Sequence, residues 1–273
     1  MVRYDLFERV DMFKRLTVFF YGVSCYAIFF ATFLYAIGFI GNFWVPRSID
    51  SPAEGGFAAN LTIDLLLLLA FALQHSVMAR PAFKRWWTQW IPEAAERSTY
   101  VLASSLALIL LFILWRPLGG LVWAVDGMAA NILYGTYAFG WLLLLASTFA
   151  VDHFDLFGLR QVWLYLRDRP YVHIEFKKLG PYRLVRHPIY VGWLVIFWAT
   201  PTMTATHLLF AVVTTAYILI AIRFEEKDLI DHLGDDYRRY RESVPMLIPF
   251  TGATAQSAGG SKITAGATAD RGD

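Results

Sequence analysis

Residues 186–226 read RHPIYVGWLVIFWATPTMTATHLLFAVVTTAYILIAIRFEE. The two apolar runs in this stretch are joined by a turn, residues 200–207, that contains no Lys, Arg, Asp or Glu. Charged residues gather at the two ends, where Arg186 opens the stretch and Glu225 and Glu226 close it. Ionisable groups next to membrane-buried helices are costly and usually functional. The stretch therefore predicts a membrane-embedded helical hairpin with a small-molecule site at its open end.

Composition places the whole chain in a membrane. Of its 273 residues, 57% are hydrophobic and 17% are charged, and the mean hydropathy is positive. A soluble domain carries fewer apolar and more charged residues. The net charge of +2 is too small to indicate a nucleic-acid partner. The single cysteine, Cys25, excludes an internal disulfide and a multi-cysteine metal site, and we predict no metal.

Apolar runs define the expected fold, an all-α polytopic membrane protein with four transmembrane helices and a C-terminal transmembrane hairpin. Roughly 20 residues cross the hydrocarbon, so the first run is long enough to span, and it is also too long for a cleaved signal peptide. The two hairpin runs are marginal in length, which leaves five or six spanning segments open. We expect one domain over residues 1–250 and a disordered tail over 251–273, rich in Gly, Ala, Thr and Ser. The runs cover about residues 17–41, 61–79, 99–115, 131–151, 188–201 and 205–224.

Basic residues in the loops predict the orientation. Loops rich in Lys and Arg alternate with loops that carry only Arg47 or only Arg116. Because short basic loops stay in the cytoplasm, both termini and the open end of the hairpin are predicted to be cytoplasmic. The expected location is the bacterial inner membrane.

The ends of the hairpin suit a particular kind of ligand. Pro188 is favoured at the first position of a helix, and the free amides that follow it can bind an anionic group. At the other end, Arg223, Glu225 and Glu226 lie within about one helical turn. A ligand with a carboxylate, an amine or sulfonium, and ribose hydroxyls would satisfy these groups. The alternative is a set of solvated ion pairs at a helix end.

Four separated segments in the last third resemble the C-terminal signature of the isoprenylcysteine carboxyl methyltransferase superfamily. They are residues 180–192 (GPYRLVRHPIYVG), 225–229 (EEKDL), 234–240 (GDDYRRY) and 244–249 (VPMLIP). The resemblance implies that residues 178–250 bind S-adenosylmethionine at the cytoplasmic membrane face, with residues 234–249 as an amphipathic lid. The cofactor-binding residues that it implies are Tyr182, Val185, Arg186, His187, Tyr190, Arg223, Glu225 and Glu226.

Three segments upstream are similar to the methanethiol S-methyltransferases of bacteria, which form dimethyl sulfide. They are residues 42–50 (NFWVPRSID), 72–80 (ALQHSVMAR) and 152–161 (DHFDLFGLRQ). The likeness covers nearly all of the chain except the tail. The middle motifs also occur in NnrU-like membrane proteins, so the resemblance implies a methyltransferase more firmly than it implies the acceptor.

The acceptor side can be predicted from the chemistry of sulfur. The nucleophile is the thiolate, so the site needs a base or a positive field. His75 and His153 are the candidates, because imidazole titrates near pH 6.5 and both residues end predicted helices on the cytoplasmic side. Asp152 and Asp155 lie beside His153 and could orient or charge its ring, so we rank His153 above His75. Arg160 is expected to add polar contacts, and the predicted catalytic residues are His153, His75, Asp155 and Arg160.

Asp64 precedes His75 by eleven residues and lies close to the same helical face. That spacing is also about 16 Å of helical rise, which places Asp64 near the opposite end of the helix. We expect it to make a buried hydrogen bond to another helix.

The sequence therefore predicts S-adenosylmethionine-dependent methylation of a small volatile thiol, namely methanethiol, by a membrane enzyme. The expected partners are this thiol and membrane lipid, with no nucleic acid and no obligate protein partner. Two alternatives remain open at this point. One is a methyltransferase for a lipidic or prenylated acceptor, and the other is an NnrU-like non-enzymatic protein of nitric oxide metabolism.

Overall fold

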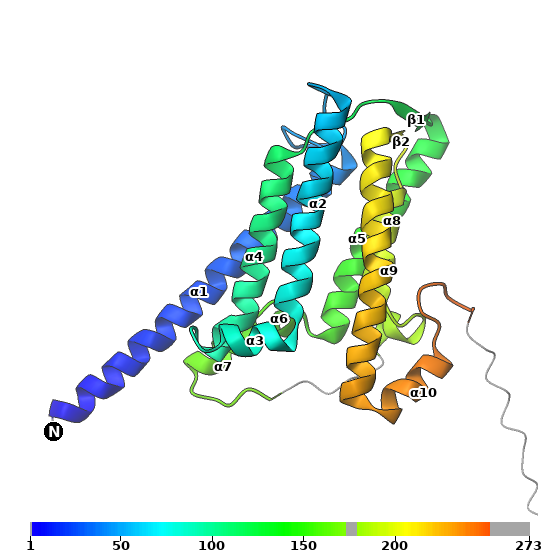
Figure 1. The fold of residues 1–273 in the computed structure, drawn as a ribbon. Coiled ribbons are helices and arrows are strands. Elements are labelled where there is room, and N and C mark those ends of the chain that lie inside the picture. The colour runs from blue at the N-terminus through cyan, green and yellow to red at the C-terminus, as the bar shows by residue number, and fades with distance from the viewer. Residues whose placement is uncertain (1, 173–178, 252–273) are drawn as a thin grey trace, which may run out of the picture.

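Long apolar helices form the body of the molecule, which confirms the predicted all-α membrane protein (Figure 1). The computed structural model describes residues 2–172 and 179–251, so the predicted disordered tail lies outside the described residues except for Thr251. Among the described residues, five helices are long and apolar enough to span a membrane. They are α1 (Val2–Gly41), α2 (Phe57–Ala79), α4 (Glu93–Leu114), α5 (Gly127–Val151) and α9 (Ala205–Leu233).

Short elements gather at the two ends of this bundle (Figure 1). One end, the α10 end, carries four short helices and one 3-10 turn. The opposite end, the sheet end, carries two short strands and the loop after α1. At the α10 end lie α3 (Pro81–Trp87), α6 (His153–Leu156), α7 (Leu159–Leu166), η1 (Gly180–Arg183) and α10 (Asp235–Ser243), and at the sheet end lie β1 (Leu121–Ala124) and β2 (Thr202–Thr204).

The predicted hairpin consists of one short and one long helix. α8 (Pro188–Trp198) has 11 residues, whereas α9 has 29. Eleven residues rise only about 16 Å, roughly half of the hydrocarbon thickness. The chain over residues 199–204 is mostly extended and completes the distance to the start of α9. Of the two hairpin helices, only α9 is therefore long enough to span alone.

The strands were not predicted, and they solve a problem that the short α8 creates. Backbone groups outside a helix need other hydrogen-bond partners in apolar surroundings. β2 pairs antiparallel with β1, and beyond the strands the Val125 amide donates to the Pro201 carbonyl at 2.9 Å. Strands of three and four residues are too short to show a period-two pattern in the sequence.

Close packing of α5 against α8 fixes the hairpin in the bundle. A Cβ atom on Gly192 would lie 3.0 Å from the Gly140 carbonyl oxygen, and one on Gly140 would lie 2.9 Å from Ile196 Cγ1. Glycines allow such close backbone approach between membrane helices. The core that surrounds this contact includes Phe39, Phe112, Tyr137, Trp141, Ile196, Phe197, Phe210 and Ile222.

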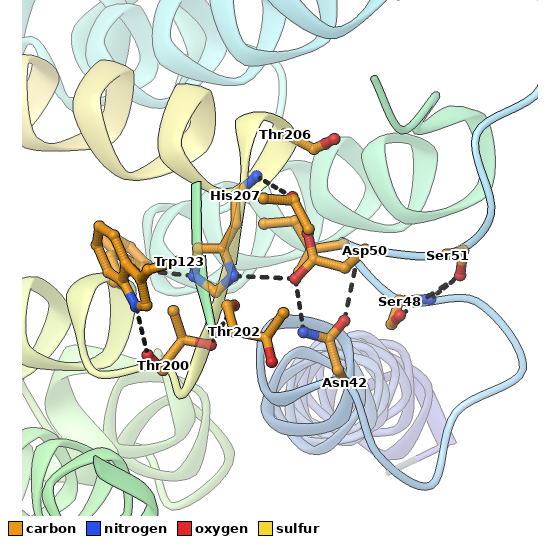
Figure 2. Close-up of polar contacts among 12 residues, drawn as sticks. Asn42, Ser48, Asp50, Ser51, Trp123, Thr200, Thr202, Thr206 and His207 are labelled. Carbon is orange, nitrogen blue, oxygen red and sulfur yellow. Dashed lines mark hydrogen bonds and ion pairs between the residues drawn. The ribbon is translucent and has the colours of Figure 1, made fainter. Parts of the chain in front are cut away.

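A buried polar cluster closes the sheet end (Figure 2). Asp50 accepts hydrogen bonds from the Thr204 hydroxyl and from Asn42 Nδ2, the latter at 2.7 Å. His207 lies between two acceptors, since its Nδ1 is 3.3 Å from Asp50 Oδ2 and its Nε2 is 3.0 Å from the Phe197 carbonyl oxygen. His207 is fully buried, and the cluster ties the loop after α1 to the start of α9.

Asp64 makes the expected buried hydrogen bond. It is fully buried, and its Oδ1 accepts from the Arg116 amide at 2.9 Å, just beyond the end of α4. The expectation that it lies far from the His75 end is also confirmed, because Arg116 leads directly toward β1 at the sheet end.

Candidate active site

Glu226 on α9 is the centre of a charged cluster at the α10 end. Its Oε1 accepts from Arg186 Nε at 2.8 Å and lies 3.1 Å from His187 Nε2. All three side chains are largely buried, with side-chain exposures of 13%, 10% and 4% for Glu226, Arg186 and His187. A buried ion pair needs further hydrogen bonds to offset its desolvation. The structure supplies them from the chain that follows α9.

α10 and the segment after it are anchored on Arg186. The guanidinium donates through Nη1 to the carbonyl oxygens of Arg241 at 3.0 Å and Val244 at 2.6 Å. The backbone amides of Arg186 and His187 donate to the carbonyls of Pro245 and Met246. This set of bonds places α10 and the segment after it beside the start of α8.

Two tyrosines of α10 hold this helix against α9 and η1. Tyr237 and Tyr240 are each 1% exposed and pack on the last turns of α9. The Tyr240 hydroxyl donates to the Tyr182 carbonyl at 2.7 Å. Burial raises the pKa of Tyr240 to about 12, and burial also raises the pKa of Tyr182. Both hydroxyls therefore stay protonated and neutral at physiological pH.

Most of the predicted cofactor residues converge on this cluster. His187 caps α8, and Pro188 occupies its first turn, as predicted. Tyr190 lies close to Glu225, whose side chain remains 44% exposed. Glu225 also lies close to Tyr182.

Two other predicted cofactor residues differ from this group in their contacts. Val185 is buried next to Arg186. Arg223 is exposed, and it forms no ion pair with any residue in the described parts of the chain. The side chain of Arg223 therefore does not join the Glu226 cluster.

His75 lies in a polar junction between α2 and α4. Its Nε2 is 2.8 Å from the Tyr100 hydroxyl, and its Nδ1 is 3.1 Å from Ser104 Oγ. The neighbouring Ser76 hydroxyl lies 3.0 Å from the Tyr217 hydroxyl on α9. Sequence reasoning missed Tyr100, Ser104 and Tyr217, because single polar residues in apolar helices carry no motif that marks them.

His153 lies in a second junction, between α1, α5 and α6. Its Nε2 is 2.8 Å from the Tyr26 hydroxyl, and its Nδ1 is 2.9 Å from Thr148 Oγ1. The ring stacks on Phe149 at a centroid distance of 4.5 Å. Burial lowers the pKa of His153, with partial opposition from the charge of Asp152.

The acidic residues beside His153 bond to other groups. Asp155 accepts from Arg160 Nη1 at 2.9 Å and from the Tyr171 hydroxyl at 3.2 Å. Asp152 accepts from the Asp155 amide and so caps α6. Neither carboxylate makes a hydrogen bond to the His153 ring in the described parts of the chain, and Asp152 acts on the ring through its charge.

Comparison with known proteins points to one activity. The phospholipid methyltransferase family model matches residues 133–236. Methanethiol S-methyltransferase of Crocosphaera subtropica is 54% identical over 88% of this chain and 94% of its own length. The protein of the same name from Mycobacterium tuberculosis is 50% identical over 87% of this chain and 98% of its own length.

Methanethiol S-methyltransferase 2 of Bradyrhizobium diazoefficiens is 52% identical over 87% of this chain and 92% of its own length. No solved structure matches the chain. The chain is a methyltransferase that belongs to the methanethiol S-methyltransferase family.

Proposed function

We propose that this enzyme methylates methanethiol to dimethyl sulfide with S-adenosylmethionine as the donor, at the cytoplasmic face of a bacterial inner membrane. The acceptor follows from the name of the relatives that match most of the chain. The face follows from the alternation of basic and nonbasic loops, which places the α10 end in the cytoplasm.

The donor set around Glu226 fits the proposed methyl donor. Glu225 keeps a partly exposed carboxylate that can bind an ammonium or a ribose hydroxyl. The amides of Ile189 and Tyr190 lie in the first turn of α8, where a helix has no internal acceptor for them, and they can bind a carboxylate. The rings of Tyr182 and Tyr190 can contact a sulfonium cation.

Buried charges hold these groups in place. Glu226 bonds to both Arg186 and His187, so it fixes the start of α8 and the segment after α10 against α9. When bound, S-adenosylmethionine supplies an electrophilic methyl group and becomes a neutral thioether once a thiolate has taken that methyl. The lid over the site excludes water, which would otherwise solvate the thiolate and weaken it as a nucleophile.

One observation carries the proposal. Segments that are separated in the sequence, namely residues 182–190, 225–226 and 240–246, meet at one charged cluster in the structure. These are the segments whose sequence resembles a cofactor-binding signature.

Headspace gas chromatography of purified enzyme in lipid nanodiscs tests the proposal. With methanethiol and methyl-deuterated S-adenosylmethionine, the enzyme should release trideuterated dimethyl sulfide. A parallel reaction with phosphatidylethanolamine in place of the thiol should give no labelled lipid. Labelled lipid without dimethyl sulfide would overturn the proposed acceptor, and no transfer to either acceptor would overturn the donor.

A further inference from the structure

We infer that the thiol is deprotonated at the His75–Tyr100 pair, with Tyr100 as the group that touches the thiol and His75 as the residue that takes up the proton through Tyr100. The inference rests on the proposed function, and it names the part of the site where the acceptor binds. It follows from four observations on the junction of α2, α4, α8 and α9.

The first observation is the geometry of the pair. The Tyr100 hydroxyl and His75 Nε2 are separated by 2.8 Å, which is a strong hydrogen-bond distance. The ring of His75 stacks on Phe71 at a centroid distance of 5.2 Å, which fixes its plane. A tyrosine held in this way can pass a proton to the imidazole without any movement of the backbone.

The second observation concerns the tautomer of His75. Ser104 Oγ accepts from the Gln74 side-chain amide at 3.3 Å and lies 3.1 Å from His75 Nδ1. A hydroxyl oxygen can accept two hydrogen bonds, so Ser104 can also accept from Nδ1–H. Nε2 is then the free acceptor and receives the Tyr100 proton, which is the arrangement that a base needs.

The third observation is the position of Tyr100 relative to the proposed cofactor site. Tyr100 and Tyr217 lie close enough to each other, and to Tyr190, to interact electrostatically. Tyr190 in turn lies close to Glu225, next to the Glu226 cluster. An ion pair of 3.0 Å between Arg80 and Asp228 holds the ends of α2 and α9 together beside these tyrosines.

The fourth observation is an incomplete hydrogen-bond set at the same junction. Gln74 Oε1 is buried and has no hydrogen-bond partner among the residues that the structure describes. Buried acceptors without partners are rare and call for an explanation. A bound molecule with a donor group would supply the missing partner, which favours this junction as a place where a ligand binds.

The two proton transfers take place in one step. The thiol S–H bond breaks and its proton moves to the Tyr100 oxygen, while the Tyr100 proton moves to His75 Nε2. The electron pair stays on the thiol sulfur and forms the new bond to the methyl carbon, while the bond between that carbon and the sulfonium sulfur of the donor breaks and leaves its electron pair on the donor sulfur. His75 ends the step as an imidazolium, which returns its proton to solvent after the product leaves.

Tyr100→Phe is the sharpest test, because it removes only the hydroxyl. The variant should keep the affinity of the wild type for S-adenosylmethionine, measured by calorimetry, and lose about 10² to 10⁴ in the rate of dimethyl sulfide formation. Tyr26→Phe is the matched control, since it removes the hydroxyl that bonds to the other histidine at the same 2.8 Å. Its rate should stay near that of the wild type.

The pH profile separates a role for His75 in proton transfer from a purely structural role. The wild-type rate should rise through an imidazole ionisation, and His75→Gln should lose that limb and follow the ionisation of the free thiol. A wild-type rate in Tyr100→Phe, or a limb that persists in His75→Gln and disappears in His153→Gln, would overturn the inference. Absence of dimethyl sulfide from the wild type would instead refute the proposed function.

Discussion

Two tyrosine–histidine pairs lie in this enzyme, and their bond lengths are the same. Tyr100 and His75 are 2.8 Å apart, and so are Tyr26 and His153. The two pairs differ in what surrounds them. Tyr100 lies near the tyrosines that lead to Glu225, whereas Tyr26 lies among aromatic rings that include Phe157.

Both ring nitrogens of His153 have a hydrogen-bond partner. The Thr148 hydroxyl already donates to the Leu145 carbonyl at 2.8 Å, so it can only accept from His153 Nδ1–H. Nε2 must then accept from the Tyr26 hydroxyl. His153 as a whole residue is only 6% exposed. A hydrogen-bonded and packed histidine of this kind stabilises the fold. His75 can hold the same tautomer, and its junction differs in that Tyr100 lies close to Tyr190, which in turn lies close to Glu225.

A double-mutant cycle gives the largest expected effect. Tyr100→Phe and His75→Gln should each slow methyl transfer by a factor of about 10² or more, and the double variant should be no slower than the slower single variant. The reason is that both residues serve one proton transfer. Single-turnover rates at saturating donor measure the cycle. Effects that multiply in the double variant would show that the two residues act independently.

Glu226→Gln should affect donor binding rather than the acceptor pair. The substitution removes a charged partner from Arg186 and His187, which costs roughly 1.5 to 3 kcal/mol, or about tenfold or more in S-adenosylmethionine affinity. Isothermal calorimetry measures the change. Glu242→Gln is the matched control, since Glu242 is exposed on α10. This variant should bind the donor with the affinity of the wild type. Equal affinities in the two variants would remove Glu226 from the donor site.

His153→Ala should act on stability. It leaves the buried Thr148 hydroxyl and the half-buried Tyr26 hydroxyl with one partner fewer, at a cost of about 1 to 3 kcal/mol in the free energy of unfolding. Thermal unfolding in detergent should show a lower Tm, and the protein that remains folded should turn over normally. Folded protein that turns over about a hundredfold more slowly than the wild type would place the base at His153 instead.

A smaller effect should appear in the pH dependence of Tm. Burial lowers the pKa of His153 in the folded state below its unfolded value of about 6.5. Below that pH the unfolded chain binds more protons than the folded chain, so this contribution to stability is complete above about pH 6.5 and is lost as the pH falls toward the folded pKa. His153→Gln should therefore lose less Tm than the wild type between about pH 7 and 5. Parallel curves of Tm against pH for the two proteins would contradict the lowered pKa of His153.

Much of the fold could be predicted because it follows from local patterns. The apolar runs gave the long helices, Pro188 marked the start of α8, and the buried bond of Asp64 followed from its place on a helical face. The short length of α8 and its compensation by β1 and β2 could not be predicted, because they depend on contacts between residues far apart in the sequence.

The candidate site could also be predicted only where it depends on local sequence patterns. Arg186, His187 and Glu226 could be proposed because they lie in recognisable motifs at the ends of one hairpin. The order of the two histidines depended on neighbours in sequence, which favoured His153 for its two aspartates. In the structure these carboxylates point to other groups, and the partners that matter to His75 come from a different helix, α4.

The ratio of two rates tests the central claim most directly. Tyr100→Phe and Tyr26→Phe are each measured for dimethyl sulfide formation in a single turnover, with the donor saturating and the folded fraction determined on the same sample. A rate in Tyr100→Phe at least about 10² below that in Tyr26→Phe is the predicted result. Equal rates, or a slower Tyr26→Phe, would contradict the assignment of the thiol to the α2–α4 junction.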